Sequence, residues 1–267
     1  MKGNRKGVNT QLTMSESGKR FKFIDLFAGI GGFHLAMDKI GGSVAAFEYA
    51  YLPRLHRQGY VAPNLGELQS DVISPGGYVM DSRPGLYKHV LVLDFKSLYP
   101  SIIRSFLIDP CAFWKADHLD LPSDETVAGF NEAIFSRQHH ILPGVIADLW
   151  AAREQAKSNN NLPLSQAIKI IMNSFYGVLG SPGCRFFDPR VCSSITLRGH
   201  EILIESKQWI ENFGYEVIYG DTDSVFVWLP QVDEAEADAI GSELAHELNK
   251  YWDEKLLNEF KLESFME

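Results

Sequence analysis

Apolar runs of strand length and stretches of helical periodicity both occur along this chain, and their order predicts an α+β domain. Apolar runs of strand length cover residues 21–27, 89–95, 215–219 and 224–229. The last two runs flank a turn that contains two aspartates, so they predict a β-hairpin. Helical periodicity covers residues 33–40, 97–106, 145–157, 164–177, 193–213 and 234–257. Strands followed by helices and then by a hairpin are typical of the α+β class.

Two stretches between these elements show neither an apolar run of strand length nor helical periodicity. Residues 43–77 contain three prolines and a Gly-Gly pair, all of which favour turns. Residues 107–140 are equally irregular. The sequence therefore predicts loops in both stretches.

The helices predicted at 145–157 and 164–177 form a hairpin, because an asparagine-rich linker that ends in Pro163 separates them. Lys169 and Asn173 are four residues apart on the second helix and so share a face. Arg153 and Lys157 have the same spacing on the first helix. The buried face of the second helix is supplied by Ile168, Ile171, Met172 and Phe175. Lys169 and Asn173 are therefore left on a polar stripe.

The distribution of charge matters more than its sum. The 267 residues carry a formal net charge of −9. Residues 231–267 hold eleven Asp or Glu against three Lys, whereas the first 22 residues are basic. This balance argues weakly against tight binding of nucleic acid by this chain alone. It does not argue against a site that collects metal ions.

The remaining composition predicts an ordinary globular protein of a reducing compartment. Hydrophobic residues make up 45% of the chain and charged residues 22%. Cys111, Cys184 and Cys192 are an odd number without a Cys-x-x-Cys pair, so we expect buried or free thiols. No apolar run approaches the ~20 residues that a membrane span needs. We therefore expect a cytoplasmic protein without membrane contact.

Three aspartates are the strongest candidates for chemistry. Asp94 ends an apolar strand, and Asp221 and Asp223 lie in the hairpin turn. Carboxylates gathered in a core are costly unless a cation neutralises them, and Mg²⁺ favours carboxylate and phosphate oxygens. Aspartate is also a common turn residue. On these positions alone, a turn aspartate and a surface carboxylate are the simpler interpretation.

The residues around the aspartates change that balance. Residues 94–103 (DFKSLYPSII), 169–177 (KIIMNSFYG) and 219–224 (YGDTDS) resemble the first, second and third polymerase motifs of family-B DNA polymerases, in the family's order. The resemblance implies a polymerase palm with a helical-hairpin fingers insertion. It also implies DNA-directed DNA polymerase activity, in which two Mg²⁺ ions support the addition of dNTPs to a primer 3′-hydroxyl.

The resemblance assigns a role to each matched residue. Asp94 and Asp223 would bridge the metal ions, with Asp221 as a supporting metal carboxylate. Tyr99 would be a steric gate beneath the deoxyribose, and its alternative role is a core aromatic. The other residues expected to meet the nucleotide are Ser97, Leu98, Arg153, Lys157, Lys169 and Asn173. The residues expected to contact primer-template DNA are Gly76, Gly77, Tyr176 and Gly177. A sliding clamp or other replication proteins are further partners of such an enzyme, although no feature of the sequence indicates them.

The same resemblance predicts how the chain is divided. The expected parts are a disordered basic tail (1–20), a strand-turn-helix unit (21–43), a first part of the palm (44–140), the fingers (141–180) and a second part of the palm (181–267). No acidic exonuclease motif lies upstream and no thumb lies downstream. We therefore expect a truncated or fused fragment of the family.

The strand-turn-helix unit has a resemblance of its own. Residues 23–33 (FIDLFAGIGGF) resemble the first motif of DNA cytosine-C5 methyltransferases, whose glycine turn implies S-adenosylmethionine binding. The Pro110-Cys111 pair lacks the residues that flank that family's catalytic cysteine. Two alternatives to a working polymerase remain. One is a methyltransferase fragment that binds S-adenosylmethionine, and the other is a non-catalytic polymerase remnant that keeps the fold.

Overall fold

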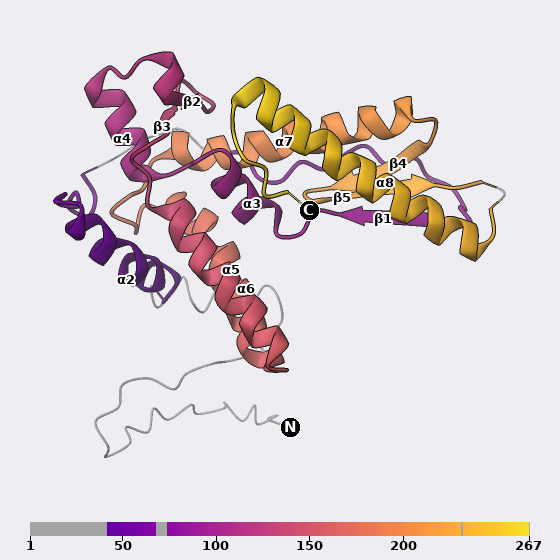
Figure 1. Cartoon of the computed structure of the whole chain (residues 1–267), viewed down its shortest axis with the longest axis horizontal. Helices are drawn as coiled ribbons and strands as arrows, with labels where there is room; N and C mark the ends of the chain where they lie inside the picture. The colour runs from indigo at the N-terminus through magenta and orange to yellow at the C-terminus, as the bar shows by residue number, and fades with distance from the viewer. Residues whose placement is uncertain (1–41, 68–73, 231, 267) are drawn as a thin grey trace, which may run out of the picture.

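The computed structural model describes residues 42–67, 74–230 and 232–266. The predictions for the tail 1–20 and for the strand and helix within residues 21–41 lie outside these ranges. Within them, the structure mixes helices and strands, as the α+β prediction requires. The main sheet lies at one end of the molecule, and a group of helices with a small hairpin lies at the other (Figure 1).

The main sheet has three antiparallel strands in the order β1-β5-β4. They are β1 (Val90–Asp94), β4 (Glu216–Asp221) and β5 (Ser224–Trp228). Val225 and Val227 of the central strand are buried, while Ser224, Phe226 and Trp228 are half-buried, because successive side chains of a strand point to opposite faces. The strand predicted at 89–95 and the hairpin predicted at 215–229 are confirmed. Their register sets Asp94 opposite Ser224, beside the hairpin turn.

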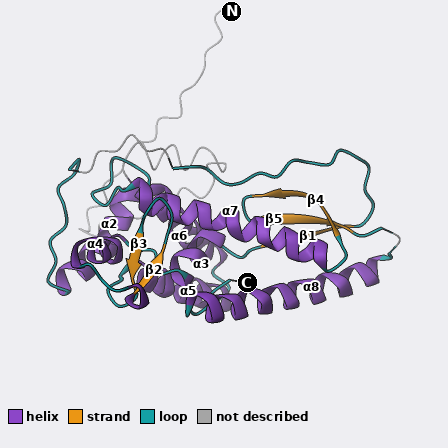
Figure 2. Cartoon of the chain, turned by 90° about the horizontal axis from the view of Figure 1, so that it is seen from above, coloured by secondary structure: helices purple, strands orange, loops and turns teal. Residues whose placement is uncertain are grey.

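Long helices support the sheet and the middle of the molecule. Helix α7 (Pro189–Asn212) packs against β4 and β5, and α8 (Glu234–Lys255) packs against β1. Both helices run past the sheet in Figure 2. The short helix α3 (Leu98–Ser105) packs between α5 and α7 through buried Ile102 and Ile103. The three helices confirm the predicted periodic segments, with shifted ends.

Helices α5 (Leu142–Ser158) and α6 (Leu162–Leu179) form the predicted helical hairpin, which projects from the body (Figure 1). The Asn161 side chain accepts a hydrogen bond from Leu164 N at 3.2 Å and so caps α6. Pro163 lies in the first turn, where a missing N–H costs nothing. Local chemistry therefore fixes where the second helix begins.

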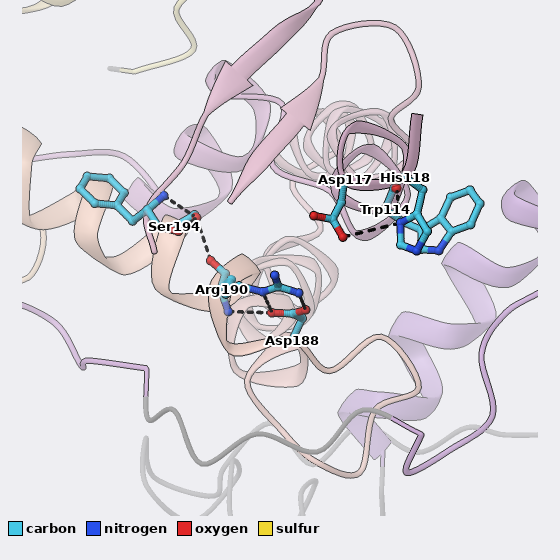
Figure 3. Close-up of polar contacts among 7 residues, drawn as sticks. Trp114, Asp117, His118, Asp188, Arg190 and Ser194 are labelled. Carbon is cyan, nitrogen blue, oxygen red and sulfur yellow. Dashed lines mark hydrogen bonds and ion pairs between the residues drawn. The ribbon is translucent and has the colours of Figure 1, made fainter. Parts of the chain in front are cut away.

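The start of α7 is fastened in a similar way. Asp188 is its N-cap and accepts from Arg190 N at 2.9 Å, and the Arg190 guanidinium donates two further bonds to the same carboxylate. One turn on, Ser194 Oγ donates to Arg190 O at 2.7 Å (Figure 3). The same hydroxyl accepts from Phe130 N at 3.0 Å, which ties the neighbouring loop to the helix.

The loop predicted for residues 43–77 is wrong in its first half, where the structure has helix α2 (Gly42–Arg57). Phe47, Tyr51 and Leu55 recur every fourth residue and are buried. The ring of Phe47 meets Phe175 of α6 with centroids 5.2 Å apart. Pro53 lies inside the helix and costs it a hydrogen bond. Burial of the aromatic face outweighs that cost, which the prediction overestimated.

The loop predicted for residues 107–140 is also wrong. This stretch contains α4 (Pro110–Leu119), a short 3₁₀ turn (Ser123–Glu125) and a small hairpin of β2 (Thr126–Ala128) and β3 (Ile134–Ser136). The signal for α4 was present in the sequence, because Asp109 followed by Pro110 is a typical helix start. The two strands of three residues are too short to show a period.

The predictions about cysteines and membranes bear on the same residues. Cys111, Cys184 and Cys192 are buried and unpaired, as expected. Among the described residues, no helix is both long and apolar enough to cross a membrane.

Candidate active site

A cavity of about 410 Å³ lies where the N-terminus of α3, helix α6 and the β4–β5 turn meet. Seven of the residues predicted for the site line this cavity, although they come from three distant parts of the chain. They are Ser97, Leu98, Tyr99, Asn173, Tyr176, Gly177 and Asp223. The fold thus gathers the three polymerase-like motifs around one hollow.

The aspartates are carried by the end of the sheet. Asp94 lies opposite Ser224, whose Oγ donates to Asp94 Oδ1 at 2.7 Å. Asp223 follows Thr222 in the hairpin turn, and its carbonyl accepts from Phe95 N at 2.8 Å. Asp223 is half-buried, whereas Asp94 and Asp221 are exposed. The backbone bond to Phe95 joins the turn to the end of β1, and so brings Asp223 to Asp94.

Asp94 and Asp221 lie close enough for their charges to act on Asp223. Burial raises the pKa of Asp223, and the negative charges of Asp94 and Asp221 raise it further. Lys169 of α6 opposes the shift. A half-buried carboxylate beside another carboxylate favours a bound cation, because the cation removes the repulsion.

The donor set fits Mg²⁺ that is shared with a phosphate-bearing substrate. In the part of the chain that the structure describes, no three His, Cys, Asp or Glu side chains are grouped closely enough to hold a metal on their own. Mg²⁺ is usually bound by one or two carboxylates together with substrate phosphates and water. Asp94 and Asp223 could supply the carboxylates, and the adjacent cavity of about 410 Å³ has room for phosphates.

Tyr99 and Tyr176 form the wall of the cavity. Their ring centroids are 4.6 Å apart. Burial raises the pKa of Tyr99 to about 12, with a further contribution from Asp223. Gly199 of α7 lies behind Tyr99, and a Cβ there would come within 3.3 Å of the ring. Sequence reasoning missed Gly199, because only the fold brings it to the ring.

The basic residues of the hairpin are arranged less uniformly. Asn173 lines the cavity, and the positive charge of Lys169 acts to lower the pKa of Asp223. Arg153 and Lys157 of α5 do not line it. Lys157 Nζ donates to Glu154 at 2.7 Å and lowers the pKa of that carboxyl. The Nε and Nη1 atoms of Arg153 are buried and have no hydrogen-bond partner among the described residues.

A segment that precedes the sheet completes the site. Gly76 and Gly77 are exposed on this segment, and its backbone pairs with the β4–β5 hairpin through Tyr78 and Met80. His200 Nε2 donates to Gly76 O at 2.7 Å. Thr222, His200 and Ser181 lie at or beside the site and were missed, since no local pattern marks them.

Comparison with known proteins decides the family. The family model for DNA polymerase family B matches residues 40–264. The chain belongs to DNA polymerase family B. DNA polymerase II of Escherichia coli is 58% identical over 223 residues, which cover 83% of this chain and 28% of that protein. The DNA polymerase alpha catalytic subunit of Mus musculus is 33% identical over 193 residues, which cover 66% of this chain and 13% of that protein.

A solved family-B structure supports the same assignment. The family B DNA polymerase of Pyrobaculum calidifontis matches with a TM-score of 0.54 and 28% identity, over 81% of this chain and 28% of that one. The family predicted from the three motifs is confirmed. The chain spans less than a third of the length of these family-B relatives. The family match begins at residue 40, so the resemblance of residues 23–33 to methyltransferases stays a prediction.

Proposed function

We propose that this chain carries the nucleotidyl-transfer site of a DNA-directed DNA polymerase, which joins a dNTP to a primer 3′-hydroxyl. The observation that carries the proposal is the meeting of Asp94 and Asp223 beside a cavity lined by Ser97–Tyr99 and by the polar side of α6. In this proposal the three-stranded sheet with α7 and α8 is the palm, and α5 and α6 are the fingers. The boundaries of the fingers at residues 141 and 180, which separate them from the two parts of the palm, belong to the same proposal.

The aspartates would hold two Mg²⁺ ions, with Asp94 and Asp223 as ligands and Asp221 as support. The ions would lower the pKa of the primer hydroxyl and neutralise charge on the triphosphate and the departing pyrophosphate. The backbone hydrogen bond from Phe95 N to Asp223 O joins the end of β1 to the turn. It would thereby hold the Asp94 and Asp223 carboxylates in fixed positions for the ions. Positioning of this kind accounts for most of phosphoryl-transfer catalysis.

Polar groups without partners are suited to the triphosphate. Ser97 has a left-handed backbone (φ 53°) at the N-cap of α3, and its buried hydroxyl lacks a hydrogen-bond partner. That turn lies at the N-terminus of α3, where the first backbone N–H groups of a helix lack intrahelical partners and anions are favoured. Arg153, Lys157, Lys169 and Asn173 would contribute from the hairpin, and Arg153 has two nitrogens, Nε and Nη1, that lack a hydrogen-bond partner among the described residues.

Primer-template DNA would lie across Gly76, Gly77, Tyr176 and Gly177, of which the last two line the cavity. A fluorescent primer-template with a dideoxy-terminated primer tests the assignment before any chemistry occurs. With Mg²⁺ present, the dNTP complementary to the template should tighten the complex at least about tenfold more than the other three dNTPs. Equal effects of all four dNTPs, or no complex, would support a non-catalytic remnant.

Tyr99→Ala should relax discrimination against ribonucleotides more than it slows the use of deoxynucleotides. The ring is held by Tyr176 at 4.6 Å and by the close approach of Gly199, so it is placed to clash with a 2′-hydroxyl. The measurement is the ratio of kcat/KM for a dNTP to that for the matching rNTP. We expect the ratio to fall at least about tenfold. Tyr99→Phe should keep it, and an unchanged ratio in Tyr99→Ala would leave Tyr99 as core packing only.

Lys169→Ala should raise the KM for dNTP with little change in DNA affinity. Lys169 is close enough to affect the Asp223 carboxyl, so its charge reaches the place where the phosphates would lie. The expected rise is about ten- to a hundredfold. Lys250→Ala, which removes an exposed charge on α8, is the matched control. A loss of DNA affinity at constant KM for dNTP would contradict the role of α6.

A further inference from the structure

We infer that the Ser74–Met80 segment is a positioning element for the turn that carries Asp221 and Asp223, and that Gly77 and His200 are its positioning residues. The inference deepens the proposed function, on which its catalytic part rests. Its structural part concerns the metal-free chain and stands independently. The segment is described from Ser74 onward, and its contacts involve the turn, α6 and α7.

The segment pairs with the edge of the sheet at the point where the aspartates begin. Met80 N donates to Gly220 O at 2.8 Å, and Thr222 N donates to Tyr78 O at 2.8 Å. Val79 bridges Asp221 in antiparallel fashion between these bonds. The segment therefore satisfies backbone groups on both sides of Asp221 that the edge strand β4 would otherwise expose.

Thr222 has an unusual conformation that the segment helps to maintain. Its φ is 54°, in the left-handed region that β-branched residues rarely adopt. Such a conformation persists only where surrounding contacts over-determine it. Thr222 has two such contacts. Its N–H bonds Tyr78 O, and its Oγ1 donates to Asp221 Oδ1 at 2.7 Å.

Gly77 makes this contact possible. A Cβ built on Gly77 would lie 2.5 Å from Thr222 Oγ1 and 2.9 Å from its Cγ2, which is closer than real atoms approach. A Cβ on neighbouring Gly76 would meet nothing within 4 Å. Neither glycine has a positive φ, so an alanine is acceptable to both backbones. As sites for a Cβ, the two positions differ in the space around them, and Gly77 is the one that lies against the turn.

His200 anchors the other side of the segment. Its Nε2 must carry the hydrogen, because the Gly76 carbonyl at 2.7 Å can only accept. Its ring also contacts Tyr78, with centroids 5.4 Å apart. Tyr176 adds a longer bond, from its hydroxyl to Pro75 O at 3.4 Å. Contacts from helices α6 and α7 thus hold the segment against the turn. In this inference, the segment and the two helices together fix the position of Asp223 relative to Asp94.

Amide hydrogen exchange of the metal-free full chain tests the inference without any activity. Gly77→Ala should displace Thr222 and so break its bond to Tyr78, which should speed exchange of the Thr222 amide about tenfold. Gly76→Ala should change that exchange far less. Gly144→Ala is the control, since its Cβ also meets nothing and it lies at the start of α5. Unchanged exchange in Gly77→Ala at an unchanged melting temperature would overturn the inference.

Two further variants guard against misfolding of Gly77→Ala. Adding Thr222→Gly to Gly77→Ala removes the clash and should restore slow exchange at position 222. His200→Ala should speed exchange of the Thr222 amide, and His200→Gln, which retains a donor, should restore most of the protection. Failure of both rescues would overturn the inference.

Primer extension then tests the link to catalysis. In Gly77→Ala, kcat should fall about ten- to a hundredfold, because small misplacements of reacting groups have effects of that size. The KM for primer-template should change less than kcat. If both glycine variants weaken DNA binding equally and spare kcat, the segment is a DNA contact and not a positioning element. An inactive wild-type chain would contradict the proposed function, while the exchange results would still decide the positioning role.

Discussion

Replacing Asp223 by asparagine is expected to slow nucleotide addition at least about a thousandfold, because a metal-bridging charge contributes several kcal/mol in the transition state. The amide is almost the same size as the carboxyl, so the hairpin turn and its backbone bond to Phe95 should persist. Single-turnover primer extension measures the rate. Normal extension by Asp223→Asn would contradict the assignment of this residue.

The same variant should be at least as stable as the wild type at neutral pH without metal. Burial and Asp94 raise the pKa of Asp223 in the folded state above its unfolded value. Such a carboxyl opposes folding once it is ionised, so the wild type should lose stability as the pH rises through the raised pKa. Asp223→Asn should lack that decrease. Asp253→Asn, an exposed change on α8, should have neither the kinetic nor the pH effect.

Asp109→Ala is expected to lower the free energy of unfolding by about 3 to 5 kcal/mol, since it leaves several buried donors unpaired. Asp109 is fully buried and accepts from Ala112 N and Leu142 N, each at 2.7 Å, and from the Tyr51 hydroxyl at 2.9 Å. These three bonds join the beginnings of α4 and α5 to α2. Burial raises the pKa of Asp109, and the same hydrogen bonds oppose that shift.

Urea unfolding of two further variants separates the causes. Tyr51→Phe removes one donor to Asp109 but keeps the ring, so we expect a loss of about 1 to 2 kcal/mol. Asp124→Ala, at an exposed position, should change stability by less than about 0.5 kcal/mol. A loss in Asp109→Ala no larger than that in Tyr51→Phe would mean that the buried carboxylate does not organise the three helices.

Local patterns predicted the elements that carry the site. The strand ending at Asp94 and the hairpin around Asp221 follow from apolar runs of strand length and from the turn residues between the last two runs. The α5–α6 hairpin follows from helical periodicity and from Asn161 and Pro163 at the start of its second helix. These features are set by neighbours in the chain, so the sequence alone reveals them.

The remaining structure depends on partners that are distant in the sequence. Helix α2 is stable because Phe47 contacts Phe175 and Tyr51 contacts Phe186. The presence of Pro53 led to the prediction of a loop there instead of a helix. His200 reaches the Gly76 carbonyl from 124 residues away. The histidine contact leaves no periodic trace in the sequence, and the four-residue spacing of Phe47, Tyr51 and Leu55 was outweighed by Pro53 in the prediction. The types of residue in the candidate site could therefore be predicted, whereas their support from Thr222, Gly199 and His200 could not.

The central claim is that the cavity beside Asp94 and Asp223 selects and joins nucleotides according to a template. The most direct measurement is single-nucleotide extension by the full chain with Mg²⁺, on four primer-templates that differ only in the templating base. Each template should yield extension by its complementary dNTP, at least about a hundredfold more efficiently than by the other three, and Asp223→Asn should abolish all four reactions. Extension that ignores the template, or extension that survives in Asp223→Asn, would contradict the account.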